Sequence, residues 1–271
     1  MTNKDITKIY FCGDEIAALY QGSTLIFKKS GVVPPSPTGV YTVRGTLKPD
    51  STVQSIQLRV NGIDEQIDIN EDKTFEHTFT NVPVTNMYNF TQPCRDKLKT
   101  LDLSNFDTSN VTNMDSMFRS CSGLTSLDVS NFNTSNVTNM NIMLSGLYLI
   151  KSLDLTSFDT SNVTKMSNML NYCLNLIDLY MNFDVSSVQF MSFIFDSNDK
   201  LTNVVGKFEG TKYDLDLSYC PLTAQSAMVF INGLATVTGK RTLKLSATTY
   251  DSLTPEQIAI ATAKGWTVTR R

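Results

Sequence analysis

A short internal repeat constrains the fold of this chain more than any other feature of its sequence. Residues 101–114 return almost unchanged as 127–140 and again as 153–166, and one phenylalanine in each copy (at 106, 132 and 158) sets a period of 26 residues. More degraded copies follow and keep the spacing of the apolar markers: Phe183, Val188 and Met191, then Val204 and Phe208. A unit this short cannot bury its apolar side alone, so neighbouring copies must stack to complete one interior.

The pattern inside each copy predicts its local structure. Leu101-Asp102-Leu103 alternates with a period of two, which is typical of a short strand. Apolar residues then recur at helical spacing over 111–118, and Ser109 stands where a helix N-cap would lie. With a period in the range of leucine-rich repeats, the predicted fold class is an α+β multidomain chain. It would contain a leucine-rich-repeat solenoid, with a strand and a short helix per repeat, preceded by small all-β modules.

The residues before the repeats divide into three parts. We expect a small β anchoring module over 1–29, a proline-rich linker over 30–39 and a small β-sandwich-like domain over 40–85. Asn61-Gly62, between two alternating runs, is a strong hairpin signal. The small modules are marginal in size, so we expect them to pack on a partner or on a copy of themselves, giving a possible homo-oligomer.

The repeat domain is expected to span 86–271 and to end in capping units from about residue 209. Two longer strand–helix units are predicted there, with a first helix over 223–234. Thr254-Pro255 opens a second helix, because threonine is a good N-cap and proline suits the first helical position.

Composition excludes several classes of function. The net charge of −3 supplies no basic field for nucleic acid, and no apolar run suits a membrane span. The first six residues show no apolar region of a secretory signal. The one histidine, His77, is expected at the surface, and no catalytic motif is present. We therefore expect a protein that is not an enzyme and that uses no cofactor, no metal, no nucleic acid and no membrane.

The sulfur-containing residues are expected to fill the core. The five cysteines are sparse and odd in number, which favours buried, reduced thiols over a disulfide framework or a zinc site; they are Cys12, Cys94, Cys121, Cys173 and Cys220. The methionines of the repeats fall on the side that must pack inward, so they are interpreted as core rather than as a metal or promiscuous binding surface.

Outward strand positions of successive repeats predict a polar binding face. Asp102, Asp128 and Asp154 occupy one column, which Tyr180 continues. A neighbouring column holds Thr100, Ser126, Ser152 and Asp178. Such a face could bind a protein or a glycan, and a bound cation could reduce the repulsion between the aspartates. The alternative interpretation is a solvated surface that only keeps the chain in solution.

The repeat LDLSNFDTSNVTNMDSMFRSCSGLTSLDVSNFNTSNVTNM resembles the BspA-like leucine-rich-repeat family of bacterial surface and phage proteins. That resemblance covers residues 95–208 and implies adhesion and protein–protein or host contact rather than catalysis. The N-terminal KIYFCGDEIAALYQGSTLIFKK is similar to a short β-module at the start of tailed-bacteriophage virion proteins. The ending LTPEQIAIATAKGWTVTRR is similar to the tail of gut-phage and gut-bacterial repeat proteins.

These resemblances imply a phage virion structural or accessory protein, of fibre or decoration type, assembled in the host cytoplasm. The N-terminal module would attach it to other virion proteins, through the side chains of Tyr10, Phe11, Tyr20 and Phe27. The repeat face would contact another virion protein or a host cell-surface protein or glycan. The alternative is a bacterial cell-surface adhesin or secreted leucine-rich-repeat protein, and a third option is a decoration protein that binds nothing outside the particle.

Overall fold

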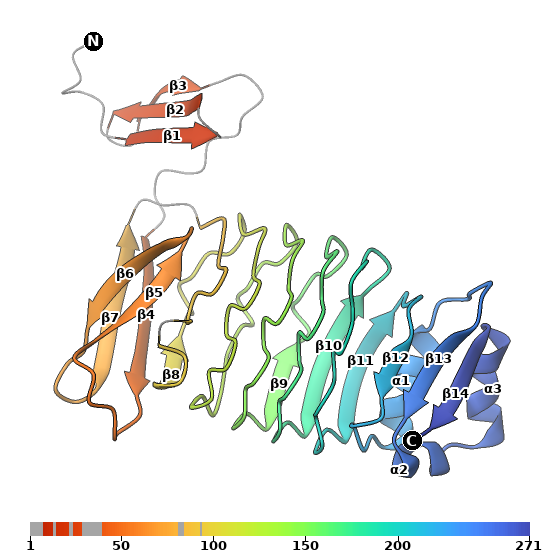
Figure 1. The fold of residues 1–271 in the computed structure, drawn as a ribbon. Helices are drawn as coiled ribbons and strands as arrows, with labels where there is room; N and C mark the ends of the chain where they lie inside the picture. The colour runs from red at the N-terminus through yellow and green to blue at the C-terminus, as the bar shows by residue number, and fades with distance from the viewer. Residues whose placement is uncertain (1–7, 13–14, 22–23, 29–39, 81–83, 93) are drawn as a thin grey trace. The chain divides into compact units, whose positions relative to one another are not determined.

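The computed structural model describes residues 8–12, 15–21, 24–28, 40–80, 84–92 and 94–271, and in these ranges the side chains from residue 42 onward except that of Thr80 (Figure 1). The chain forms two compact units. The first comprises residues 1–41 with 78–83, and the second comprises 42–77 with 84–271.

The first unit contains one antiparallel sheet of order β1-β2-β3. Its strands are β1 (Lys8–Cys12), β2 (Glu15–Gln21) and β3 (Thr24–Lys28). A bulge interrupts each of the two pairings, the first between Tyr10 and Phe11. The side chains of Tyr10, Phe11, Tyr20 and Phe27, predicted to make the virion attachment, lie outside the described residues.

Four strands precede the repeats: β4 (Val40–Leu47), β5 (Ser55–Val60), β6 (Ile63–Asp68) and β7 (Thr74–Thr80). β5 and β6 form a hairpin whose register runs from Ser55↔Asp68 to Val60↔Ile63. Asn61 and Gly62 close it with φ values of 52° and 81°. Two positive φ values are those of a type I′ turn, so the hairpin predicted from this dipeptide is confirmed.

The strands before the repeats cover the backbone of the first repeat on two sides. β4 pairs antiparallel with β8 (Leu98–Asp102), in a sheet of order β7-β4-β8. On the other side, the amide of Asn61 donates to the carbonyl of Asn86 over 2.9 Å. The Asn61 carboxamide oxygen also accepts from the amides of Thr85 and Asn86. Polar backbone groups that would end the row of repeats are therefore satisfied.

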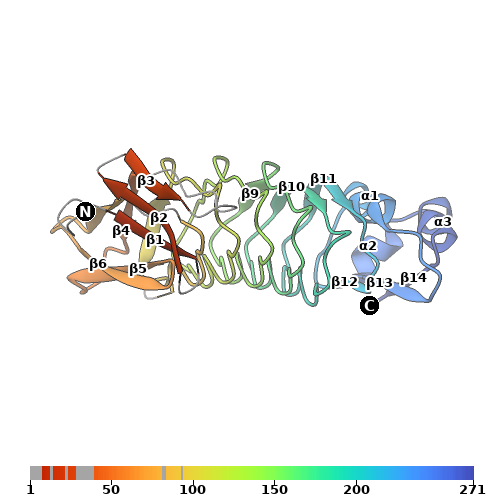
Figure 2. The ribbon, with the colours of Figure 1, turned by 90° about the horizontal axis from the view of Figure 1, so that it is seen from above.

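The repeats, residues 84–209, stack through backbone hydrogen bonds from one copy to the next. A column of parallel bridges joins equivalent positions: Asn86, Asn113, Asn139, Lys165 and Phe190. Strands β9 (Ser152–Leu155), β10 (Asp178–Asp184) and β11 (Asn203–Glu209) form a parallel sheet of order β11-β10-β9. Figures 1 and 2 show the successive coils side by side from β8 to β11.

The interior of the stack is apolar, as the sequence predicted. The methionines and phenylalanines of the repeats are buried: Met114, Met117, Met140, Met143, Met166, Met169, Phe106, Phe132 and Phe158. The rings of Phe132 and Phe158 stack with centroids 6.5 Å apart and planes 7° apart. The four described cysteine side chains, Cys94, Cys121, Cys173 and Cys220, are also buried and unbridged. The prediction of free thiols is confirmed for these four.

The predicted fold class, an α+β chain with a leucine-rich-repeat solenoid of strand plus helix, is wrong. The described residues form small two- and three-stranded sheets, and helices occur only after residue 223. Residues 111–118 turn instead of forming a helix, because Ser116 and Ser120 both adopt φ of 58°. Left-handed residues four apart prevent a helix, and amides such as that of Met114 donate to the next repeat instead. Residues 125–129 also lack the predicted strand.

The chain ends in a parallel sheet with helices. Its strands are β12 (Leu215–Leu217), β13 (Arg241–Leu245) and β14 (Trp266–Arg270), in the order β12-β13-β14. Helix α1 (Ala224–Gly233) follows β12, and α2 (Ala247–Asp251) and α3 (Pro255–Ala263) follow β13. The helix start predicted at Thr254-Pro255 is confirmed, with a full capping box to Gln257.

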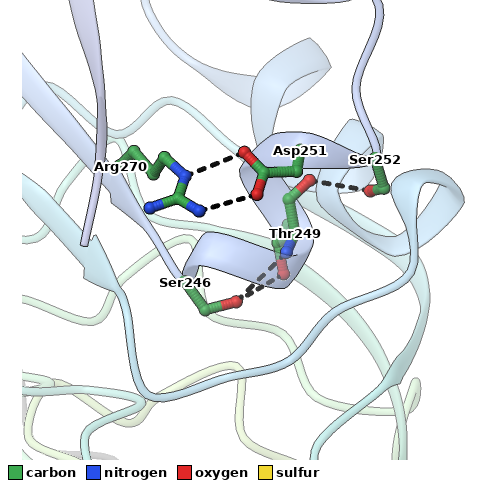
Figure 3. Close-up of polar contacts among 5 residues, drawn as sticks. All are labelled: Ser246, Thr249, Asp251, Ser252 and Arg270. Atoms are coloured by element: carbon green, nitrogen blue, oxygen red, sulfur yellow. Dashed lines mark hydrogen bonds and ion pairs between the residues drawn. The ribbon is translucent and has the colours of Figure 1, made fainter.

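Side-chain contacts fix helix α2 against the last strand (Figure 3). Ser246 caps the helix by accepting from the amide of Thr249, and the Ser252 hydroxyl donates to the Thr249 carbonyl over 2.7 Å. Arg270 makes a two-pronged pair with Asp251, at 2.8 and 2.7 Å. Both partners are about half exposed, so this pair orients β14 more than it stabilises the chain. In the part of the chain described here, no helix has the length and apolarity needed to cross a membrane.

Candidate binding surface

The predicted polar face is present but is divided among different local structures. Thr100 and Asp102 lie on β8, whose pairing partner is β4 rather than another repeat. Ser126 and Asp128 lie in the segment without a strand, and both are exposed. The remaining members lie on adjacent parallel strands, with Ser152 beside Asp178 and Asp154 beside Tyr180. The face is therefore a row of polar side chains and not one continuous sheet.

The three aspartates of the predicted column lie at or next to the ends of their strands or extended segments. In each of them Oδ1 accepts the backbone amide two residues further on, at 2.9 Å for Asp102, 3.0 Å for Asp128 and 2.9 Å for Asp154. These bonds from residue i+2 to the carboxylate form Asx turns. They hold the pKa of Asp102 and of Asp128 below its usual value. The pKa of Asp154 is lowered first by the hydroxyl of Thr156, which donates to the same Oδ1, and then by the backbone amide of Thr156. One oxygen of each aspartate therefore has a local structural role.

The charges of neighbouring aspartates in the column also affect one another. The charge of Asp128 opposes ionisation of both Asp102 and Asp154, although the hydrogen bonds outweigh it and the pKa of each stays lowered. Within the described residues there is no group of three or more histidine, cysteine, aspartate or glutamate side chains suited to a metal ion. The column offers no described set of ligands for the cation that the sequence suggested.

Two other predicted residues have partners within the surface. Asp178 Oδ1 accepts from the carboxamide of Asn203 on β11 over 2.9 Å. Tyr180 lies in register between Asp154 on one side and Val205 on the other. Val205 is 45% exposed, so the polar column becomes apolar on β11.

Sequence reasoning missed an apolar surface at the turns that lead into β9 and β10. We call it the apolar corner, and its exposed members are Tyr148, Leu149, Tyr172, Leu174 and Ile177. The earlier repeat has small residues at the equivalent places, with Ser122 where later repeats have Tyr148 and Leu174, and Gly123 where the next repeat has Leu149. Comparing the repeats position by position would have found it, because these turns diverge while the core positions persist.

Hydrogen bonds between repeats hold the apolar corner in place. The Asn175 carboxamide donates to the carbonyl of Tyr148 over 2.6 Å, and the amide of Ile177 donates to the carbonyl of Lys151 over 2.8 Å. Beneath them, the buried Asn198 carboxamide accepts from the amide of Cys173. These contacts fix the backbone on which the apolar side chains stand, so the surface is preorganised.

Two further aromatic side chains are exposed on the following repeat. Phe190 is 57% exposed and Phe193 is 62% exposed, the latter with a left-handed φ of 57°. Exposed apolar side chains are therefore concentrated between residues 148 and 205, whereas the described part of 84–136 contributes only Tyr88 to them. Single exposed apolar residues need no explanation, but a group of them on adjacent turns is typical of an interaction site.

Comparison with known proteins bears on the repeats. Residues 83–208 match a family model described as "Mycoplasma protein of unknown function, DUF285". A search of curated proteins found no match. A search of solved structures also found none.

Proposed function

We propose that this chain is a non-enzymatic binding protein, acting as a structural or accessory protein of a phage virion. Its repeats would mediate adhesion to another protein or to the host surface. The observation that carries the proposal is the apolar corner, because stacked turns hold five exposed apolar side chains on a rigid backbone. Protein interfaces are enriched in such aromatic side chains at their centre.

The sequence of the repeats supports the adhesive part of the proposal. The segment that matches the family model is the repeat segment itself, and its motif resembles the BspA-like repeats of bacterial surface and phage proteins. The virion part is supported by the resemblance of the first residues to a tailed-phage β-module. The second candidate, a bacterial cell-surface adhesin or secreted repeat protein, shares the adhesive surface and differs in location.

Mass spectrometry of purified phage particles separates these candidates, if the particles are those of the phage whose genome encodes the chain. We expect the chain in the particles, at a constant ratio to other virion proteins through a density gradient. Absence from the particles, together with display on uninfected bacteria, would contradict the virion role and favour the adhesin.

Repeat-matched variants test the apolar corner. Tyr148→Ser and Leu174→Ser introduce the residue that the earlier repeat already has at Ser122, so the fold is expected to persist. We expect the double variant to lose binding of the full chain to host cells or to disrupted virions by at least about tenfold, as for loss of interface anchors. The matched control is Thr125→Val, an exposed change in the earlier repeat. Unchanged binding by the folded double variant would refute the assignment.

A further inference from the structure

A cavity of about 410 Å³ opens on the sheet β7-β4-β8, away from the apolar corner. Each strand contributes two alternating side chains, which therefore stand on one face of the sheet. They are Thr74 and Glu76 from β7, Arg44 and Thr46 from β4, and Thr100 and Asp102 from β8. We call it the threonine pocket. Its size falls in the range of small-molecule sites.

Hydrogen bonds within the lining hold the polar groups in place. The hydroxyls of Thr46 and Thr100 lie 2.9 Å apart across the β4–β8 pairing. Arg44 Nη2 donates to Glu76 Oε1 over 2.8 Å, and the Asn70 carboxamide donates to the Thr74 hydroxyl over 2.9 Å. Apart from Asn70, which lies in the connection before β7, these groups occupy strands rather than loops, so little order has to be gained when a ligand binds.

Gly45 allows the sheet to form this floor. A Cβ at this position would lie 2.5 Å from the carbonyl oxygen of Thr100 and 2.6 Å from Cζ of Phe75. The bare glycine lets the buried Phe75 ring approach β4 directly. Gly45, Phe75 and Leu101 also line the cavity.

The charges of the threonine pocket are mixed. The guanidinium of Arg44 is bonded to Glu76 and also interacts with the charge of Asp102. An anionic ligand would meet two carboxylates, and a cationic ligand would meet the guanidinium. A neutral ligand with several hydroxyl groups meets neither penalty. It can donate to the carboxylates, accept from Arg44 and exchange hydrogen bonds with the threonines, whose hydroxyls do both.

We propose that the threonine pocket binds a neutral saccharide unit, through the hydroxyls of Thr46 and Thr100 and the charged groups of Arg44, Glu76 and Asp102. This inference does not rest on the proposed function, which depends on the apolar corner. It adds a second site with a different class of ligand, at the end of the repeats nearest to β4.

The test is an NMR titration of the full ¹⁵N-labelled chain with lactose, trehalose and N,N′-diacetylchitobiose. Small neutral ligands on shallow sites bind in the millimolar range, so titration to about 50 mM reaches saturation. We expect at least one sugar to shift the amides of residues 44–46, 74–76 and 100–102 together. No saturable shift with any of the three sugars would overturn the proposal. So would saturable shifts confined to the apolar corner, which would leave the proposed function standing.

The double variant Thr46→Val/Thr100→Val keeps the shape of the pocket and removes both hydroxyls. Because both hydrogen-bonding partners are replaced together, we expect the fold to persist, as judged by the dispersion of the amide spectrum. Affinity for the responding sugar should fall about tenfold or more, since two hydroxyls that exchange hydrogen bonds with the ligand are lost together. Thr125→Val, an exposed threonine outside the pocket, should bind as the unmodified chain does. Equal affinity of the double variant would refute the site.

Discussion

Replacing Thr134 by valine removes a hydroxyl that joins two repeats. Its Oγ1 donates to the carbonyl of Asp159 over 2.9 Å and accepts the amide of the same residue over 2.8 Å. Thr108 and Thr160 make the same paired bonds to their following repeats. Thr134 is 1% exposed, and the two bonds between its hydroxyl and the backbone of Asp159 are partly buried. This column of threonines connects the interior of the stack with its backbone.

The cost follows from two partly buried bonds that are lost together. Valine has nearly the shape of threonine, so no cavity forms, but the amide and carbonyl of Asp159 lose their side-chain partner. A buried unsatisfied polar group costs about 1–3 kcal/mol, and these two groups are only partly buried, so we expect Thr134→Val to lower the free energy of unfolding by about 1–3 kcal/mol in total.

Urea unfolding followed by circular dichroism measures this change. Thr134→Ser retains the hydroxyl and should lose about 1 kcal/mol or less, whereas the exposed change Thr125→Val should lie within about 0.5 kcal/mol of the unmodified chain. A loss below about 0.5 kcal/mol for Thr134→Val would refute the claim that these hydroxyls join the repeats.

Three other changes test separate features. Ile142 has a left-handed φ of 57°, a conformation that β-branched residues disfavour, and the equivalent residue of the next repeat, Asn168, adopts it too. Ile142→Asn should therefore raise the free energy of unfolding by about 1 kcal/mol. A decrease in the free energy of unfolding would contradict this. The pKa of Asp159 is lowered by bonds from the hydroxyl and amide two residues on. Its stabilisation is present above about pH 4 and lost as the pH falls through the lowered value, so Asp159→Asn should flatten the fall in stability on acidification, measured by urea unfolding at several pH values. Burial raises the pKa of Cys121 and Cys173 to about 12. At pH 8 these thiols should therefore react with a thiol reagent only as fast as the chain unfolds. Rapid modification of the folded chain would show that they lie at the surface.

The apolar interior was predictable because its signal is periodic. Phe132 and Phe158 recur at one spacing, and positions that recur at a fixed spacing must share one environment in a stack. The C-terminal helix start at Thr254 was predictable for a different reason, since its capping box is a local signal that needs no neighbour.

The turns between the strands were not predictable from local pattern. Ser116 and Ser120 carry no glycine-like signal, yet both are left-handed, because bonds to the next repeat fix their backbone. Apolar residues at helical spacing over 111–118 therefore pack inward without a helix. The same dependence on distant partners hid the pairing of β4 with β8.

The predicted binding residues illustrate a similar limit. Asp102, Asp128 and Asp154 were placed correctly on the surface, but the sequence did not show that each caps a local turn. The threonine pocket contains Thr100 and Asp102 of β8, and its other strands come from earlier in the chain. Thr46 of β4 lies 54 residues before Thr100, and Thr74 of β7 lies 26 residues before it (100 − 74). No spacing rule joins positions that far apart.

Hydrogen exchange of three amides tests the continuous stack most directly. Met114, Met140 and Met166 each donate to a carbonyl of the following repeat, at 2.9, 2.8 and 2.8 Å. If one interior and one set of inter-repeat bonds hold the repeats together, these amides should share a single slow exchange rate that rises together with urea. Rapid exchange at Met140 while Met114 and Met166 stay protected would show that the repeats open independently, and would contradict the account.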